Sequence, residues 1–206
     1  MQAVIHDLAD QWPLSGATEL RDRVLAAYDD PARGYHDRRH LAEVCGRVEE
    51  LIAHGVAADR EAVLLAAWFH DAVYDGERDA EERSAVWAEI DLPAAGVPRA
   101  TVAEVARLVR LTETHRPEDG DVDGSVLSDA DLAILAAPEE RYAEYAADVR
   151  RDFSHVPDAD FRAGRAAVLR DLLSKPRLFH TAYAREHWEA AARANVEREL
   201  ATLATP

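Results

Sequence analysis

The chain has one cysteine and one lysine, and each shortage excludes a class of protein. Cys45 stands alone among 206 residues, which excludes an intramolecular disulfide and a cysteine-based zinc site. Lys175 is the only lysine, so arginine supplies the rest of the 24 basic residues. With 40 acidic residues the formal net charge is −16. A chain this acidic is not expected to bind a nucleic-acid polymer or an anionic membrane surface.

Long apolar runs are also absent. The longest, Ala62–Phe69, is far shorter than the roughly 20 residues that a membrane-spanning helix needs. Met1–Asp10 has neither the basic stretch nor the apolar stretch of an export signal. Hydrophobic residues make up 48% of the chain and charged residues 31%, which is a globular composition. We therefore expect a cytoplasmic globular protein.

Periodicity predicts helices nearly throughout. Alanine is abundant, whereas glycine and proline number nine each, and this composition favours helices. Apolar residues recur at helical spacing, and no stretch alternates as a half-buried strand would. Cys45 lies on one such apolar stripe and is expected in the core. The fold class is therefore all-α, a single domain of roughly eight to ten helices over residues 1–206. Predicted helices cover about 15–28 (capped by Ser15), 41–54, 59–74, 80–90, 98–111, 127–136, 138–153, 158–173 and 181–203, with an irregular stretch at 116–125.

Two histidine-containing segments carry the first chemical signals. His70-Asp71 directly follows the apolar run, and a carboxylate buried there needs a hydrogen-bond partner, an opposite charge or a metal. The alternative is a helix end with Asp71 in solvent. His36 and His40 are spaced to share one helical face, which suits a metal or a histidine pair. The alternative there is a polar helix start.

A third segment places two aspartates in apolar sequence. Asp129 and Asp131 lie within Leu127–Leu135, where a helix interior disfavours aspartate. Asp129 could instead be an N-cap or first-turn residue, which the helix dipole favours. That alternative accounts for Asp129 better than for Asp131.

In this order the segments resemble the HD superfamily of metal-dependent phosphohydrolases, and specifically a bacterial subgroup of about this length. The resemblance implies a compact HD-type helical bundle with its core at about 35–173 and a C-terminal helix at about 181–203. It also implies that His40, His70 and Asp71 bind a metal, with Asp131 as fourth ligand and Asp129 in reserve or orienting a ligand. The matching blocks are Tyr35–His40, Trp68–Tyr74, Asp129–Leu135 and Ala192–Leu200.

The resemblance further implies hydrolysis of a small phosphate mono- or diester, often a nucleotide, by a metal-activated water. Two imidazoles and two carboxylates accept Mn²⁺, Fe²⁺, Co²⁺, Ni²⁺ or Zn²⁺, and Mg²⁺ less readily. A second metal would be accommodated if His36 and His115 both face the pocket. Candidates for proton transfer are Glu81, His115, His36 and Asp129, and candidates for phosphate binding are Arg150, Arg165 and Arg193, which interrupt apolar helices.

Two other functions stay open at this stage. The chain could be an HD-type di-iron oxygenase, because His36 and His115 are additional histidines that could bind a second iron. It could also be a non-catalytic helical binding protein in which the ion only stabilises the fold. Asp119–Gly124 matches the first half of a calcium-binding EF-hand loop, but Ala130 stands where the bidentate glutamate belongs, so we expect a flexible acidic loop. We expect a homodimer, although no motif specifies one.

Overall fold

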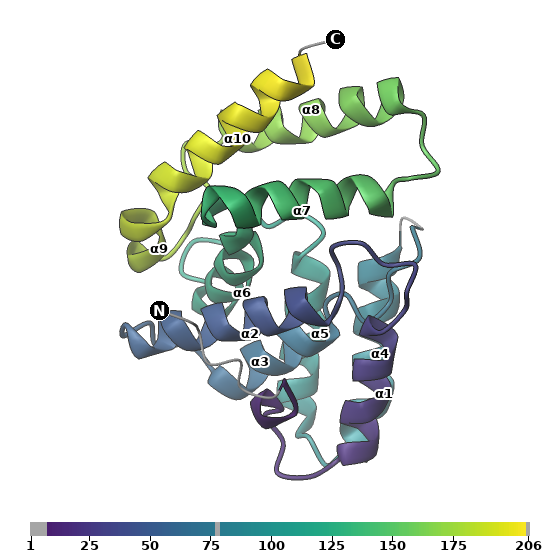
Figure 1. The fold of residues 1–206 in the computed structure, drawn as a ribbon. Coiled ribbons are helices and arrows are strands. Elements are labelled where there is room, and N and C mark those ends of the chain that lie inside the picture. Colours follow the sequence, from purple (N-terminus) through teal and green to yellow (C-terminus); the bar gives the residue numbers. More distant parts are fainter. Residues whose placement is uncertain (1–7, 77–78, 205–206) are drawn as a thin grey trace.

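The computed structural model describes residues 8–76 and 79–204, and all regular structure in those residues is helical. The all-α prediction is therefore confirmed. Figure 1 shows α7, α8 and α10 stacked at one end of the molecule, with the helices that precede them below. The α-helices are α1 (Thr18–Tyr28), α2 (Arg38–Ala53), α3 (Arg60–Phe69), α4 (Ala80–Ala94), α5 (Arg99–Leu111), α6 (Val122–Leu132), α7 (Glu139–Asp152), α8 (Asp158–Ser174), α9 (Ala182–His187) and α10 (Glu189–Ala204), with 3₁₀ turns η1 (Leu8–Gln11) and η2 (Ala133–Ala136).

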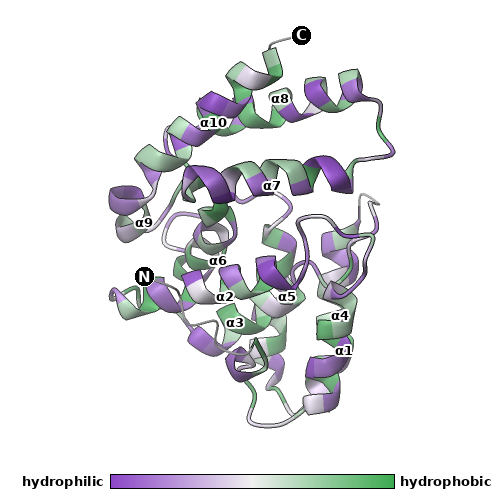
Figure 2. Cartoon of the chain, viewed as in Figure 1, coloured by the Kyte–Doolittle hydropathy of each residue, from purple (hydrophilic) through white to green (hydrophobic). Residues whose placement is uncertain are grey.

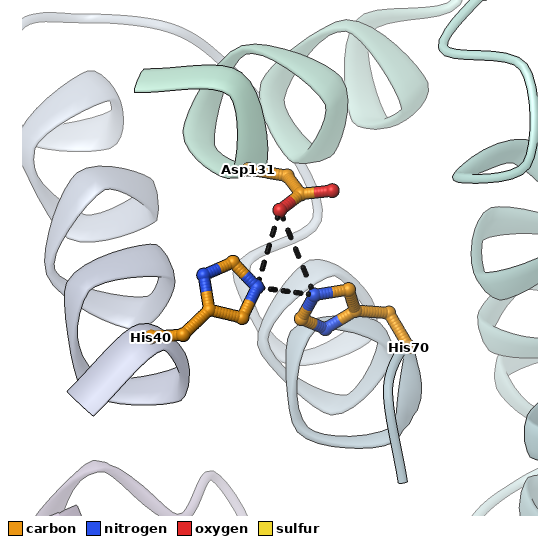
Figure 3. Close-up of side chains that lie close together, drawn as sticks. All are labelled: His40, His70 and Asp131. Atoms are coloured by element: carbon orange, nitrogen blue, oxygen red, sulfur yellow. Dashed lines mark hydrogen bonds and ion pairs between the residues drawn. The ribbon is translucent and has the colours of Figure 1, made fainter. Parts of the chain in front are cut away.

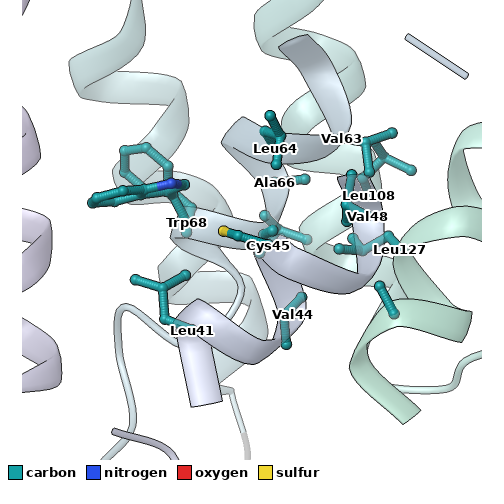
Figure 4. Packing of buried hydrophobic residues seen from close by; sticks show 14 of the residues in the cluster. Leu41, Val44, Cys45, Val48, Val63, Leu64, Ala66, Trp68, Leu108 and Leu127 are labelled. Atoms are coloured by element: carbon teal, nitrogen blue, oxygen red, sulfur yellow. The ribbon is translucent and has the colours of Figure 1, made fainter. Parts of the chain in front are cut away.

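Helix α3 forms the centre of the core, as its apolar run predicts. Every side chain from Ala62 to Phe69 is fully buried, and α3 packs against α2, α5 and α6. Figure 4 shows Trp68 beside Cys45 and Leu41 of α2. Cys45 is completely buried, which confirms its place in the core, and burial raises the pKa of its thiol. A helix that is apolar on all sides has no face to offer to water.

The outer helices each keep one face in solvent. Hydrophilic and hydrophobic residues alternate along α7 in Figure 2, and only Tyr142, Tyr145 and Val149 of that helix are buried. In the described residues no helix is both long enough and apolar enough to cross a membrane. Residues 1–7, which belong to the stretch where no export signal is expected, lie outside the described part of the chain, so the structure does not test that expectation.

Several helix boundaries differ from the prediction for identifiable reasons. Ser15 does not cap α1, because the helix begins three residues later and Ala17, at φ 52°, occupies the cap position. Helix α3 ends at Phe69 rather than at Tyr74, so Asp71 lies in a turn. The stretch predicted as irregular ends early because the Asp121 side chain accepts a hydrogen bond from Gly124 N and starts α6 at Val122.

The predicted C-terminal helix is two helices, α9 and α10. The chain breaks at Trp188, whose side chain is buried against Phe179 and Tyr183. The Glu189 carboxylate, the first residue of α10, accepts hydrogen bonds from the backbone N–H groups of Leu178 and Phe179. These hydrogen bonds hold the loop that precedes α9 against the start of α10.

Candidate metal centre

Three helices and one turn bring the four predicted ligand side chains together. His40 lies in the first turn of α2, and its N–H donates to the Asp37 side chain, which caps that helix. His70 is the C-cap residue directly after α3, and Asp71 follows it in the turn. Asp131 lies near the end of α6. Because α2, α3 and α6 pack on one another, their ends meet at one point inside the fold.

The donor atoms of this cluster have the spacing of ligands around one ion (Figure 3). The Nε2 atoms of His40 and His70 are 3.0 Å apart, and Asp131 Oδ1 lies 3.3 Å from the first and 3.7 Å from the second. Asp71 Oδ2 lies 3.2 Å and 3.1 Å from the same two nitrogens. Ligands about 2.1 Å from an ion are about 3.0 Å apart at right angles and about 3.4 Å apart in a tetrahedron. His40, His70 and Asp131 could therefore hold a metal ion.

Each imidazole ring is held through its Nδ1 atom, on the side away from the cluster, as is usual for metal-binding histidines. His70 Nδ1 lies 2.7 Å from the carbonyl oxygen of Ala67 and donates a hydrogen bond to it, so in the neutral ring the lone pair is on Nε2, which faces the cluster. His40 Nδ1 lies 2.9 Å from the Tyr35 hydroxyl. Both imidazoles are only 1% exposed, so their hydrogen bonds are made with protein groups rather than with bulk water.

The electrostatics of the cluster favour bound cations or protons. Burial lowers the pKa of His70, but the charges and hydrogen bonds of Asp71 and Asp131 outweigh it and raise that pKa well above its usual value. The pKa of His40 is raised in the same way, against the effect of burial. Burial raises the pKa of Asp71 and Asp131, yet the charge of His70 and hydrogen bonds from both histidines lower it far more. Two ionised carboxylates therefore face the imidazoles.

Two residues that support Asp71 carry no signal in the sequence. Arg33 is 8% exposed, and its guanidinium donates to the carbonyl oxygens of His36 (2.9 Å), Asp71 (2.8 Å) and Ala72 (3.1 Å). The Tyr28 hydroxyl donates to Trp68 O and accepts from Asp71 N. The contacts with Trp68, Asp71 and Ala72 join residues about forty positions apart, so no local pattern could have indicated them.

His115 and Glu81, two candidates for proton transfer, lie near the cluster. His115 Nε2 is 3.5 Å from Asp131 Oδ2, and its buried Nδ1 has no hydrogen-bond partner within the described residues. Its backbone has φ 49°, in the left-handed region, and burial lowers the pKa of its ring. Burial also raises the pKa of Glu81, in the first turn of α4, and the charge of Asp71 adds to that increase.

His36 precedes α2, so it does not share a helical face with His40 as the spacing suggested. Its ring nevertheless lies against that of His40, with 5.6 Å between centroids, and stacks on Tyr74 at 4.0 Å. Its Nδ1 is 3.0 Å from the carboxylate of Asp152.

Asp129 has a different environment from that of Asp131. It is fully buried, and its two oxygens accept hydrogen bonds of 2.7 Å from the backbone N–H groups of His180 and Thr181. It is neither an N-cap nor a first-turn residue, since Asp121 caps α6. Burial raises the pKa of Asp129 to about 6, and the two hydrogen bonds moderate that shift. Its carboxylate fixes the loop before α9 and does not join the cluster.

The three arginines expected to bind phosphate are engaged elsewhere. Arg150 pairs with Asp158 and donates to the carbonyl oxygens of Phe153 and Val156. Arg165 donates to Glu199 and to the Tyr145 hydroxyl, and Arg193 donates to Glu189 and to backbone carbonyls of the loop before α9. Each arginine holds helices of the C-terminal region together, and within residues 8–76 and 79–204 none of the three forms a hydrogen bond or ion pair with a residue of the metal centre.

A groove of about 820 Å³ borders the cluster. His40 and Asp131 are among its lining residues, and Val44 and Ile134 contribute apolar wall. Its volume lies in the range of pockets that hold small organic ligands.

Comparisons with known proteins identify no relative. No protein-family model matches the chain. No curated protein matches it. No solved structure matches it.

Proposed function

We propose that the chain is a metal-dependent phosphohydrolase of the HD type that cleaves a small phosphate mono- or diester. The observation that carries the proposal is the convergence of His40, His70 and Asp131 at single-ion spacing, with Asp71 Oδ2 3.2 Å and 3.1 Å from the two imidazole Nε2 atoms. These are the four residues that the resemblance assigns to the metal. Two buried imidazoles and two carboxylates make a mixed nitrogen and oxygen site, which suits Mn²⁺, Fe²⁺, Co²⁺, Ni²⁺ or Zn²⁺.

The chain's own groups have separate roles in this proposal. His40 and His70 present Nε2 lone pairs, and the contacts of Nδ1 with Tyr35 and Ala67 keep the rings in place. Asp71 and Asp131 supply two negative charges that balance a divalent cation. An ion held there lowers the pKa of a coordinated water and polarises a phosphoryl oxygen.

Glu81 is the proposed acceptor of the proton that the attacking water releases. Its pKa is raised by burial and by the charge of Asp71, which brings it nearer to the operating pH that an effective base needs. His115 lies at Asp131 Oδ2, where its ring can hydrogen-bond a substrate oxygen on the far side of that carboxylate. The groove beside His40 and Asp131 offers room for the organic part of the ester.

The proposal is tested by metal analysis together with a panel of phosphate mono- and diesters. We expect Asp71→Ala to lose bound metal and to lower turnover by about a thousandfold or more, since an ion contributes several kcal/mol to such a reaction. Asp22→Ala, at an exposed residue of α1, is the matched control and should change neither quantity. Metal retained at full occupancy in Asp71→Ala would refute the assignment of Asp71.

The two alternatives give different results in the same assay. The proximity of His115 to Asp131 favours a di-iron oxygenase as second candidate, because it offers a ligand beyond the first four. Iron content with oxygen consumption and no phosphate release would support that function. If chelation unfolds the helices and no ester is turned over, the ion is structural and the enzyme proposal fails.

A further inference from the structure

A single carboxylate joins the end of α7 to the loop that enters the metal centre. Asp152, the last residue of α7, is 3% exposed at its side chain. It accepts hydrogen bonds from the backbone N–H groups of Gly34 and Tyr35 (3.1 Å for Tyr35) and from His36 Nδ1 at 3.0 Å. Three donors from consecutive residues thus converge on one group more than a hundred positions away in the sequence.

Gly34 permits this close approach. A Cβ atom at position 34 would collide with the backbone oxygen of Asp148 and lie 2.8 Å from the Asp152 carboxylate. Only glycine lets the loop lie so close to α7. The loop is therefore seated on the helix end at a fixed distance, and it carries both Tyr35, the partner of His40, and His36.

The contact with Asp152 also determines how the His36 ring is presented. Burial raises the pKa of Asp152, but the hydrogen bonds from His36, Gly34 and Tyr35 outweigh it, so the group is ionised and acts only as an acceptor. His36 Nδ1 must then carry a proton, and in the neutral ring Nε2 carries the lone pair. Nε2 has no hydrogen-bond partner among residues 8–76 and 79–204, since the hydrogen bond of this ring is made by Nδ1.

The His36 ring lies beside the metal centre. One face of the ring stacks on Tyr74, which follows Asp71 in the same turn, and the ring also contacts that of His40. The side chain is 23% exposed, so a ligand can reach it. The ring thus stands at the accessible rim of the cluster with an acceptor nitrogen and no partner.

We propose that Asp152 is a positioning residue that seats the Gly34–His36 loop on α7 and fixes His36 in the tautomer whose Nε2 accepts a hydrogen bond from the attacking water. His36 is the residue that touches the reacting group, and Asp152 acts through it. This inference rests on the proposed phosphohydrolase function, which makes a phosphate ester the group that the water attacks. It rests on the contacts of Asp152, Gly34 and Tyr74 for the orientation of the ring.

The first test is spectroscopic and needs no substrate. In the ¹⁵N spectrum of the wild-type protein near neutral pH, the neutral His36 ring should be protonated at Nδ1, both without metal and with Mg²⁺ or Zn²⁺ added. In Asp152→Asn the amide offers one acceptor oxygen to three donors, so we expect His36 to populate the Nε2-protonated tautomer or to lose a defined one. Nδ1 unprotonated in the wild type would overturn the proposal even if Asp152→Asn failed to fold.

The second test separates positioning from general stability. We expect Asp152→Asn to lower kcat by about 10- to 100-fold with KM and metal affinity unchanged, and Asp152→Glu to restore part of that loss. Glu140→Gln, at an exposed residue of the first turn of α7, is the matched control and should behave as wild type. His36→Gln should lower kcat similarly, and the double variant should lower it no further.

The outcomes of the two tests are distinguishable. Additive effects of Asp152→Asn and His36→Gln, or an unchanged His36 tautomer in Asp152→Asn, would overturn the role of Asp152 while leaving the phosphohydrolase intact. A wild-type protein that binds metal and turns over no phosphate ester would overturn the proposed function, whereas the tautomer spectrum would still judge the positioning of His36.

Discussion

Asp129 and Asp131 lie two positions apart in α6 and face different surroundings. Each residue of an α-helix adds about 100° of rotation, so side chains at positions i and i+2 are about 200° apart and point to nearly opposite sides of the helix. Asp131 points to the imidazoles of His40 and His70, while Asp129 accepts the backbone N–H groups of His180 and Thr181. One carboxylate is thus available to a cation and the other is part of the scaffold.

Substituting each aspartate should separate metal binding from stability. Asp131→Asn removes the negative charge at the cluster, so we expect metal affinity to fall by at least about tenfold. Asp129→Asn should leave metal affinity within about twofold of wild type and lower the free energy of unfolding by about 1–3 kcal/mol, because one of two buried N–H groups loses its acceptor. Calorimetric metal titration and urea unfolding measure the two effects. A folded Asp129→Asn that no longer binds metal would contradict these assignments.

At the scale of the element, the turn after α3 depends on a buried arginine. Arg33 donates to three carbonyl oxygens, two of them in the turn that carries Asp71, and lies over the rings of Tyr28 and Tyr74. The contact with the Ala72 carbonyl is buried, and those with His36 and Asp71 are partly buried. The position of Asp71 therefore depends on a loop that precedes α2.

Removing the Arg33 guanidinium should loosen this turn. We expect Arg33→Met to lower the free energy of unfolding by about 2 kcal/mol or more and to weaken metal binding, since buried carbonyls left unpaired cost about 1–3 kcal/mol each. Arg38→Met is the control, because Arg38 forms an exposed pair with Asp29 and should cost less than about 1 kcal/mol. Denaturant unfolding and metal titration measure both. Equal effects of the two substitutions would count against the role of Arg33.

The C-terminal helix is joined to the metal-binding half by an amide. Asn195 is 5% exposed, and its Nδ2 donates to the carbonyl oxygens of Leu135 (2.8 Å) and Ala137 (2.9 Å), at the end of η2. The turn η2 directly follows α6, which carries Asp131. The conspicuous Ala192–Leu200 block of the sequence thus has a structural role in docking α10.

Asn195→Ala should destabilise the protein without altering the cluster. Two buried carbonyls would lose their donor, so we expect the free energy of unfolding to fall by about 2 kcal/mol while metal affinity changes less than about twofold. Thr202→Ala, at an exposed residue of the same helix, should cost less than about 0.5 kcal/mol. Thermal unfolding with and without metal compares the two. Loss of metal binding in folded Asn195→Ala would show that α10 does more than dock.

Across the whole molecule, the acidic residues outnumber the basic ones by 16, but only a few carboxylates have a large effect on stability and binding. Many carboxylates lie on helix faces in pairs with arginine, such as Glu82 with Arg110, and such exposed pairs contribute little. Asp71 and Asp131 are different because they face two buried imidazoles and are themselves largely buried. In the metal-free protein, protons on these histidines balance the two carboxylates.

This balance predicts how the stability of the metal-free protein depends on pH. The pKa values of His40 and His70 are raised in the folded state, so their contribution is complete below pH 6.5 and is lost as the pH rises through the raised values. The pKa of Asp129 is also raised, to about 6, so its contribution to stability is likewise lost as the pH rises, but between about pH 4 and pH 6. We therefore expect the Tm of the metal-free protein to fall above pH 6.5.

Metal should replace the lost protons. We expect the rise in Tm on adding Mn²⁺ or Zn²⁺ to be larger at pH 8 than at pH 6, because binding must displace protons at the lower pH. The measurement is thermal unfolding across this range with and without metal. A metal-induced rise that is the same at both values would contradict the account of the cluster.

The sequence predicted what depends on neighbours in the chain. The buried course of α3, the His70-Asp71 pair at its end and the place of Cys45 follow from local spacing and apolar runs. The choice between Asp129 and Asp131 did not follow, because it depends on which side of α6 meets α2 and which meets the loop before α9. Arg33 and Asp152 were missed because their partners lie far away in the chain and no repeat or spacing marks them.

The central claim is that one divalent ion binds between His40, His70, Asp71 and Asp131. Its most direct test is an anomalous difference map from crystals of the full chain soaked in Mn²⁺ or Zn²⁺. We predict a single strong peak about 2.0–2.3 Å from the Nε2 atoms of both histidines and from a carboxylate oxygen of each aspartate. A peak held by other residues, or saturating metal with no density at this cluster, would contradict the claim.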